Sequence, residues 1–190
     1  DQVSSVSEHP FANAASRAWL AAIDAWARRD AEAFAALQSH LRRYRDHRRL
    51  FHLDLDREQF LDFTRSTLDM AVGRSVELLA TRGERLALKR FTLNMAEDAV
   101  GPSAIDSLLL IETDERGDII AYDRFDADDV DAAWAALDAR WVETCPASEW
   151  AVVANDRATA DVMAKRDWNG LAARLAPDFV AHDHRLLGWG

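Results

Sequence analysis

The stretch SLLLIETDERGDIIAYDRF, residues 107–125, decides the fold class of this chain. Its two ends, residues 107–112 and 119–125, are rich in aliphatic side chains, and the polar segment 114–118 between them contains Gly117. Two apolar runs around a short glycine-containing segment are typical of a β-hairpin, because glycine accepts the backbone angles that tight turns require. The stretch therefore predicts a pair of antiparallel strands.

A second hairpin is predicted just upstream. Residues 75–80 and 85–95 are mainly apolar, and they flank a turn at 81–84 that contains Gly83. This is the same pattern of strand, glycine turn and strand. Together the two hairpins predict a sheet of four consecutive antiparallel strands.

Helices precede this sheet in the chain. Trp19, Ile23 and Trp26 recur at helical spacing, which predicts a helix over residues 13–29 with one buried stripe. Asp30 follows it and is placed to cap a second, short helix, because an Asp side chain accepts hydrogen bonds from the free N–H groups of a first turn.

A polar strand, a third helix and an exit helix complete the predicted domain. The strand is expected over residues 43–50, and Asp56 with Gln59 has the spacing of a capping box that opens a helix. Asp126 is expected to cap the exit helix. The apolar positions of that helix are Val130, Trp134, Leu137 and Trp141. Helices and strands segregated in this way predict an α+β fold, in which a curved, mainly antiparallel sheet packs on about three helices and leaves a pocket.

The end of the chain repeats its beginning. Residues 24–48 align without a gap with residues 161–185, and the triplet Asp-His-Arg at 46–48 recurs in register at 183–185. A repeat this long indicates two copies of one domain, since the repeats of solenoids are shorter. The incomplete second copy and the initial Asp indicate a fragment of a longer protein. We expect a linker at 1–12, a domain at 13–125, an exit helix and linker at 126–146, and the truncated start of a second copy at 147–190.

Several segments carry a resemblance to a known family. They are RDHRRLFHLDLDREQFLDF (45–63), ELLATRGERLALKRF (77–91), LLLIETDERGDIIAYDRFDADDVDAAWAALDARW (108–141) and the opening helices and strand at 161–185. In this order they resemble the NTF2-like superfamily, and in particular its SnoaL-like branch. The resemblance implies a cone-shaped domain that commonly pairs as a homodimer. It also implies either a binding module or an enzyme, since the family hosts dehydratases, isomerases, polyketide cyclases and epoxide hydrolases. Tandem copies resemble the C-terminal regions of multidomain bacterial regulators and cyclases.

Composition excludes several classes of function. A formal net charge of −10 argues against nucleic acid as a partner, because phosphate binding requires a basic face. The sequence has no apolar run near the ~18 residues of a membrane span and no signal-peptide pattern, so we expect a cytoplasmic protein without a membrane partner. A single cysteine, Cys145, excludes an internal disulfide and a cysteine-based metal cluster. His182 and His184 share a strand face but lack a third ligand, so we expect no metal and no cofactor.

The polar strand holds the candidate catalytic residues Asp46, His47 and Arg48. The enzymes of the family use a buried Asp or His as a general acid/base, which works when burial brings its pKa near the working pH. Because side chains alternate along a strand, Asp46 and Arg48 share one face and His47 lies on the other. A structural Asp–Arg pair is the competing interpretation. The candidate ligand-binding residues are Tyr44, Arg90, Tyr122 and Arg124.

The leading functional hypothesis is a noncatalytic SnoaL-like module of a larger bacterial protein. It would bind a small apolar molecule or a neighbouring domain, in a sensory or assembly role. The main alternative is an acid/base enzyme of the cyclase, isomerase or dehydratase kind that uses Asp46 with His47 or Arg48. An open pocket that holds a carboxylate without a permanent Arg partner would favour the enzyme. A third alternative is a dimerisation module, whose pocket would be filled by its own Trp and Phe side chains.

Overall fold

The computed structural model of this chain describes residues 10–68, 71–95 and 103–180. Within these residues the chain divides after Thr144 into two compact units. The linker expected at 1–12 lies mostly outside the described residues.

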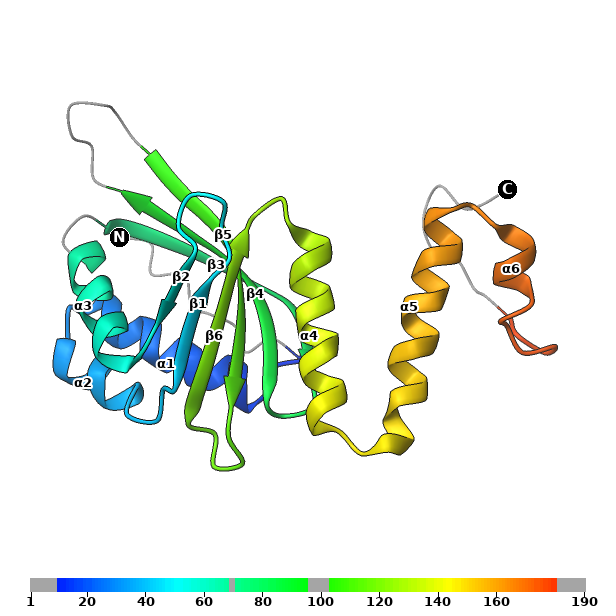
Figure 1. The fold of residues 1–190 in the computed structure, drawn as a ribbon, viewed down its shortest axis with the longest axis horizontal. Helices are drawn as coiled ribbons and strands as arrows, with labels where there is room; N and C mark the ends of the chain where they lie inside the picture. Colours follow the sequence, from blue (N-terminus) through cyan, green and yellow to red (C-terminus); the bar gives the residue numbers. More distant parts are fainter. Residues whose placement is uncertain (1–9, 69–70, 96–102, 181–190) are drawn as a thin grey trace. The chain divides into compact units, whose positions relative to one another are not determined.

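The first unit is built on a curved six-stranded sheet (Figure 1). Along the sheet the strands follow the order β2-β1-β6-β5-β4-β3. Neighbouring strands are antiparallel except β1 and β6, which are parallel. The predicted α+β fold with a mainly antiparallel sheet is therefore confirmed. The strands are β1 (Arg43–Asp46), β2 (Leu53–Leu55), β3 (Ala71–Arg82), β4 (Leu86–Met95), β5 (Ser103–Thr113) and β6 (Ile119–Asp126).

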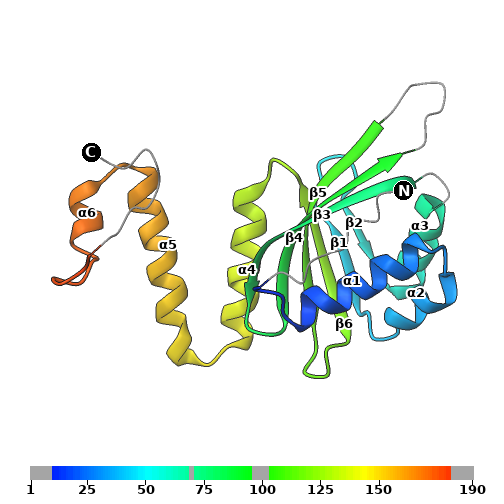
Figure 2. The same cartoon turned by 180° about the vertical axis from the view of Figure 1, so that it is seen from behind.

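Four helices belong to this unit, and they cover both faces of the sheet. The apolar side chains of α1, α2 and α3 pack on one face, where α1 lies across the strands (Figure 2). Those of α4 pack on the opposite face. Two of the predicted caps are in place, since the Asp30 side chain accepts from the N–H of Ala33 and Asp56 exchanges two hydrogen bonds with Gln59. The third prediction is wrong, because Asp126 ends β6 and its carboxylate accepts from the N–H of Arg49, while the exit helix begins at Val130. The helices are α1 (Ala14–Ala27), α2 (Ala31–Leu37), α3 (Arg57–Leu68) and α4 (Val130–Thr144).

Asn13 ties the first helix to the first hairpin. Its side-chain oxygen accepts from the N–H of Ser16, which caps α1, while its amide donates to the carbonyls of Gly83 and Leu86 at 2.8 and 2.9 Å. One side chain thus satisfies a helix end and the turn between β3 and β4. This contact fixes where α1 begins relative to the sheet.

Two covered faces explain the unbroken apolar run of β5. Leu109 and Ile111 pack in the core under α1–α3, whereas Leu108 and Leu110 pack in the core under α4. A strand that is buried on both faces has no solvent side, so its sequence does not alternate between apolar and polar residues.

Three local predictions differ from the structure. The polar strand expected over 43–50 ends at Asp46, because the chain then turns, with the N–H of Phe51 donating to the carbonyl of Arg48. The short β2 that follows is too brief to leave an alternation in the sequence. The exit helix begins only at Val130, whose side chain is exposed, while Leu137 is buried.

The second unit repeats the backbone of α1 and α2. It holds a short 3-10 turn, Ala147–Glu149, followed by α5 (Trp150–Ala164) and α6 (Trp168–Ala172). Arg166 adopts a positive φ of 54°, as Arg29 does at 57° after α1. Asp167 then caps α6 by accepting from the N–H of Gly170, as Asp30 caps α2. The two helix pairs thus share an Arg with positive φ followed by a capping Asp.

Candidate functional site

A cavity opens on the sheet face that α1, α2 and α3 cover. Its volume is about 90 Å³. This is less than the few hundred cubic ångströms of a typical ligand cleft, so without movement of the wall it admits only a small molecule or part of one. The residues that line it are Trp19, Ala22, Ile23, Trp26, Phe34, Tyr44, Phe60, Phe63, Thr64, Phe91, Leu93, Leu109, Tyr122 and Arg124.

Aromatic rings form most of the cavity wall. Trp19 of α1 meets Phe91 of β4 edge to face, with ring centroids 5.4 Å apart. Phe60 of α3 lies between Tyr44 and Tyr122, at centroid distances of 4.9 and 5.5 Å. Pairs of this kind hold each other in place, so the wall is rigid and presents ring faces and edges to an occupant.

The hydroxyl groups of the wall already donate to protein acceptors. Thr64 donates to the carbonyl of its own helix at Phe60 at 2.7 Å. Tyr44 donates to Asp46 Oδ2, and Tyr122 donates to Gln38 Oε1, both at 3.2 Å. Burial raises the pKa of both phenols above the ordinary value, so they remain protonated.

Among the described residues that line the cavity, Arg124 of β6 is the charged one. Its Nε donates to Ser107 Oγ at 3.0 Å, and its charge partly offsets the rise in the pKa of Tyr44 that burial causes. Its Nη2 is buried and makes no hydrogen bond of good geometry with the described atoms, although the guanidinium lies close enough to the Tyr44 hydroxyl to lower the pKa of that phenol by hydrogen bonding. Burying such a donor unpaired costs free energy, so a ligand acceptor at this point would be favourable.

Asp46 is buried beside this cavity but is occupied by Arg48. Its Oδ1 accepts from the backbone N–H and the Nε of Arg48, at 3.1 and 2.9 Å. Its Oδ2 accepts from Arg48 Nη2 at 2.7 Å and from the Tyr44 hydroxyl. The guanidinium also lies 4.0 Å over the ring of Phe51. Four donors satisfy a carboxylate fully, so Asp46 is a permanently paired anion in this structure.

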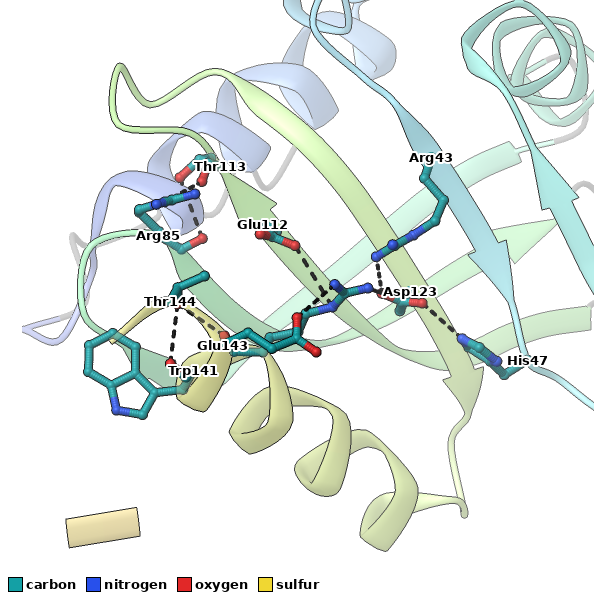
Figure 3. A network of polar contacts seen from close by, with 10 residues as sticks. Arg43, His47, Arg85, Glu112, Thr113, Asp123, Trp141, Glu143 and Thr144 are labelled. Carbon is teal, nitrogen blue, oxygen red and sulfur yellow. Dashed lines mark hydrogen bonds and ion pairs between the residues drawn. The ribbon is translucent and has the colours of Figure 1, made fainter. Parts of the chain in front are cut away.

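His47 points away from Asp46, to the other face of the sheet. Its Nε2 lies 2.9 Å from Asp123 Oδ1 (Figure 3). Its ring also stacks on Phe125, with centroids 4.8 Å apart. Asp123 also pairs with Arg43 and Arg140, so His47 belongs to a polar network against α4. The structure brings Asp46 and Arg48 together and separates His47 from both.

Solved structures resemble the first unit. The protein RV0760c of Mycobacterium tuberculosis aligns with a TM-score of 0.50 at 11% identity, over 61% of this chain and 92% of its own. Its complex with estradiol-17beta-hemisuccinate aligns at 0.48 with 12% identity, over 59% and 92%. A SnoaL-like polyketide cyclase of Shewanella denitrificans aligns at 0.46 with 10% identity, over 63% and 96%. No protein-family model matches the sequence, and neither does any curated protein.

The first unit has the NTF2-like fold. The curved sheet with α1–α3 on its concave face is the cone that the sequence resemblance implies. At identities this low the likeness concerns the backbone, so the role of each side chain in this NTF2-like unit has to come from its own contacts.

Arg90 does not join the cavity. Arg90 lies on the α4 face of the NTF2-like sheet, where its Nη2 donates to the carbonyl of Ala127 at 3.2 Å and its Nε lies 3.7 Å from Asp106. His182 and His184 lie outside the described residues. The residues that the structure describes contain no cluster of three or more His, Cys, Asp or Glu side chains suited to a metal.

The sequence prediction missed most of the cavity wall. The helical spacing of Trp19 and Trp26 predicts a buried stripe, and no candidate site residue was predicted at Phe34, Phe60 or Phe91. A stripe of large aromatics has the same spacing whether it fills a core or frames a cavity, so spacing does not separate the two. None of the described helices is both long and apolar enough to cross a membrane.

Proposed function

We propose that the NTF2-like unit is a noncatalytic module that binds a small apolar molecule in its aromatic cavity. The observation that carries this proposal is the composition of the wall. The described residues that line it are apolar or aromatic apart from Thr64 and Arg124, with the two tyrosine hydroxyls already bonded to protein atoms. A mostly apolar cleft with few polar groups is the common form of a small-molecule site.

The alternative of an acid/base enzyme has less support from the geometry. The described lining includes no carboxylate and no histidine. Asp46 carries a permanent Arg48 partner, and His47 faces the other side of the sheet. A general base needs a free lone pair within reach of the substrate proton, and Asp46 has its lone pairs occupied. The dimerisation alternative is disfavoured by the unfilled cavity volume.

Binding is tested with 2-naphthamide, a neutral planar probe, by isothermal titration calorimetry. We expect Ala22→Phe to weaken binding about tenfold or more, because Ala22 lines the cavity and a phenyl ring would occupy it. Ala21→Phe is the matched control, since Ala21 precedes it on α1 and is exposed. Equal binding to both variants and the unchanged protein would place the probe elsewhere, and no binding at all would overturn the proposal.

We also propose the wider organisation that the repeat implies. Residues 147–190 would be the opening of a second NTF2-like copy in a multidomain, cytoplasmic bacterial protein, and the domains would pair as homodimers. The matching turn at Arg29 and Arg166 supports the copy, and the exposed side chains of Trp150, Trp168 and Phe179 support an apolar docking face. Light scattering on chains with and without residues 145–190 tests this, and a monomer in both cases would contradict the pairing.

A further inference from the structure

The cavity contains a cation, Arg124, that forms no salt bridge with an acidic side chain of the described residues. Arg124 sits among aromatic side chains, and its Nη2 is buried without a hydrogen-bond partner in the described part of the chain. The whole molecule carries a formal net charge of −10, so acidic side chains are abundant elsewhere. A positive group left unpaired at this one point therefore needs a specific explanation.

Asp46, the acidic residue opposite Arg124 in the sheet, already pairs with Arg48. Asp46 is the register partner of Arg124 across the parallel pair of β1 and β6. Its oxygens accept two bonds from the side chain of Arg48, one from the backbone of Arg48 and one from Tyr44. Because those four bonds fill its acceptor positions, Asp46 leaves the Nη2 of Arg124 free.

The hydroxyl groups of the wall already donate their hydrogen bonds to protein acceptors. The hydroxyls of Tyr44, Tyr122 and Thr64 donate to Asp46, Gln38 and the Phe60 carbonyl. Among the described residues that line the cavity, Arg124 Nη2 is therefore the donor that makes no hydrogen bond of good geometry with the protein. A ligand polar group must then be an acceptor, and it must lie at the β6 side of the cavity.

A second cation adds to the positive character of this face. Lys89 of β4 is 2% exposed, donates to the carbonyl of Ser16 at 3.0 Å and lies 4.6 Å from the centroid of the Trp19 ring. Trp19 lines the cavity, so the wall lies between Lys89 and the occupant. Two buried cations in one apolar environment favour an anionic acceptor over a neutral one, because electrostatic attraction is stronger where water is excluded.

We infer that the ligand of this cavity is a small apolar carboxylic acid, whose carboxylate pairs with Arg124 while its apolar body lies against the aromatic wall that includes Trp19, Phe60 and Phe91. The inference rests on the proposed binding function and adds to it the chemical class of the ligand. A guanidinium N–H forms a charge-assisted hydrogen bond with a carboxylate, which is about twice as strong as a neutral one. Of its donors, Arg124 commits Nε to Ser107 and keeps Nη2 for the ligand.

The test compares 2-naphthoate with 2-naphthamide, two probes of the same shape that differ in charge. By calorimetry on the full chain at neutral pH, we expect the naphthoate to bind about tenfold or more tightly than the amide, as a charge-assisted bond replaces a neutral one. In Arg124→Gln this preference should disappear, while the affinity for the amide changes less than about twofold. Arg90→Gln is the matched control, since Arg90 lies on the other sheet face, and it should keep the full preference.

The outcomes separate the two proposals. Equal binding of naphthoate and amide to the unchanged protein would overturn the anionic ligand and leave the binding function standing. Failure of both probes would overturn the binding function and the anionic ligand with it. If Arg124→Gln still bound 2-naphthoate more tightly than 2-naphthamide, the carboxylate would pair with a cation other than Arg124. The comparison on the unchanged protein decides the matter even if Arg124→Gln does not fold.

Discussion

Arg48 holds Asp46 through two side-chain hydrogen bonds, Nε to Oδ1 at 2.9 Å and Nη2 to Oδ2 at 2.7 Å, where both residues are at most 4% exposed. The pair forms immediately after β1, because the chain turns there and carries Arg48 back toward the strand. A carboxylate bound in this way is held in place by its donors. This pairing favours a structural role for Asp46 over a catalytic one.

Asp46→Asn should therefore act on stability and leave ligand binding unchanged. Removing one partner of a buried ion pair leaves the other charge unpaired, so we expect a loss of about 3 kcal/mol in the free energy of unfolding. Urea denaturation measures it. Asp54→Asn is the control, because Asp54 pairs with Arg45 at the surface and should cost less than about 1 kcal/mol. If Asp46→Asn lost 2-naphthamide binding while its stability stayed unchanged, Asp46 would belong to the binding site.

Lys89→Met should stabilise the protein at neutral pH. Burial lowers the pKa of Lys89 from 10.5 to about 8, so the folded state bears a charge without a counter-ion. We expect a gain of about 1 to 3 kcal/mol at pH 7, reduced by loss of the bond to Ser16. The destabilisation is complete below the folded pKa and fades as the pH rises from about 8 to 10.5, because the folded protein releases the proton first.

Denaturation of Lys89→Met and of the unchanged protein between pH 7 and 10.5 tests this, since the gap between them should narrow. The matched control is Lys165→Met, which removes the other lysine, an exposed residue paired with Asp161. It should give a flat difference near zero. A destabilised Lys89→Met at pH 7 would mean that the contacts with Ser16 and Trp19 outweigh the cost of burying the charge.

Gly83→Ala should cost more than Gly117→Ala. Both glycines occupy hairpin turns with positive φ, 52° and 87°, where an L side chain is strained. We expect about 1 kcal/mol of lost stability from that strain at either position. A Cβ on Gly83 would also lie 2.6 Å from the ring of Trp141, whereas one on Gly117 would meet nothing within 4 Å. Thermal unfolding should rank the two variants, and an equal cost would show that Trp141 moves aside freely.

Leu137→Ala should loosen α4 from the sheet. Leu137 is fully buried against the core on that face, so its truncation should cost about 2 to 5 kcal/mol. Val130→Ala is the control on the same helix. Val130 is 40% exposed, and we expect a change within about 0.5 kcal/mol. Hydrogen exchange of the α4 amides would follow the loosening, and a negligible cost at Leu137 would contradict the packing of α4.

Local features that depend on a single backbone turn and a single side chain were predictable from the sequence. Asp30 and Asp56 cap helices as the sequence indicates, and Gly83 and Gly117 mark the two hairpins. These are short-range interactions, so the neighbouring residues contain most of the information. Asp167, which aligns with Asp30 in the sequence, also caps a helix and also follows an Arg with positive φ.

The end of β1 shows where such reasoning stops. Alternation along a strand predicts the sides of Asp46 and His47 correctly, but β1 ends at Asp46 and its partner β2 leaves no pattern in the sequence. Strand ends depend on which distant segment supplies the hydrogen bonds, and β1 obtains them from β2 and β6.

The sequence by itself determined the helix caps, the hairpin turns, the apolar stripes and hence the α+β class. Only the tertiary structure decided that Asp46 is saturated by Arg48, that Arg90 faces α4, and that Arg124 keeps a buried donor free in an aromatic cavity. The physical reason is that caps and turns form between neighbours in the chain. Whether a charge is paired depends instead on groups from distant strands, such as Ser107 beside Arg124, which only folding brings within hydrogen-bond distance.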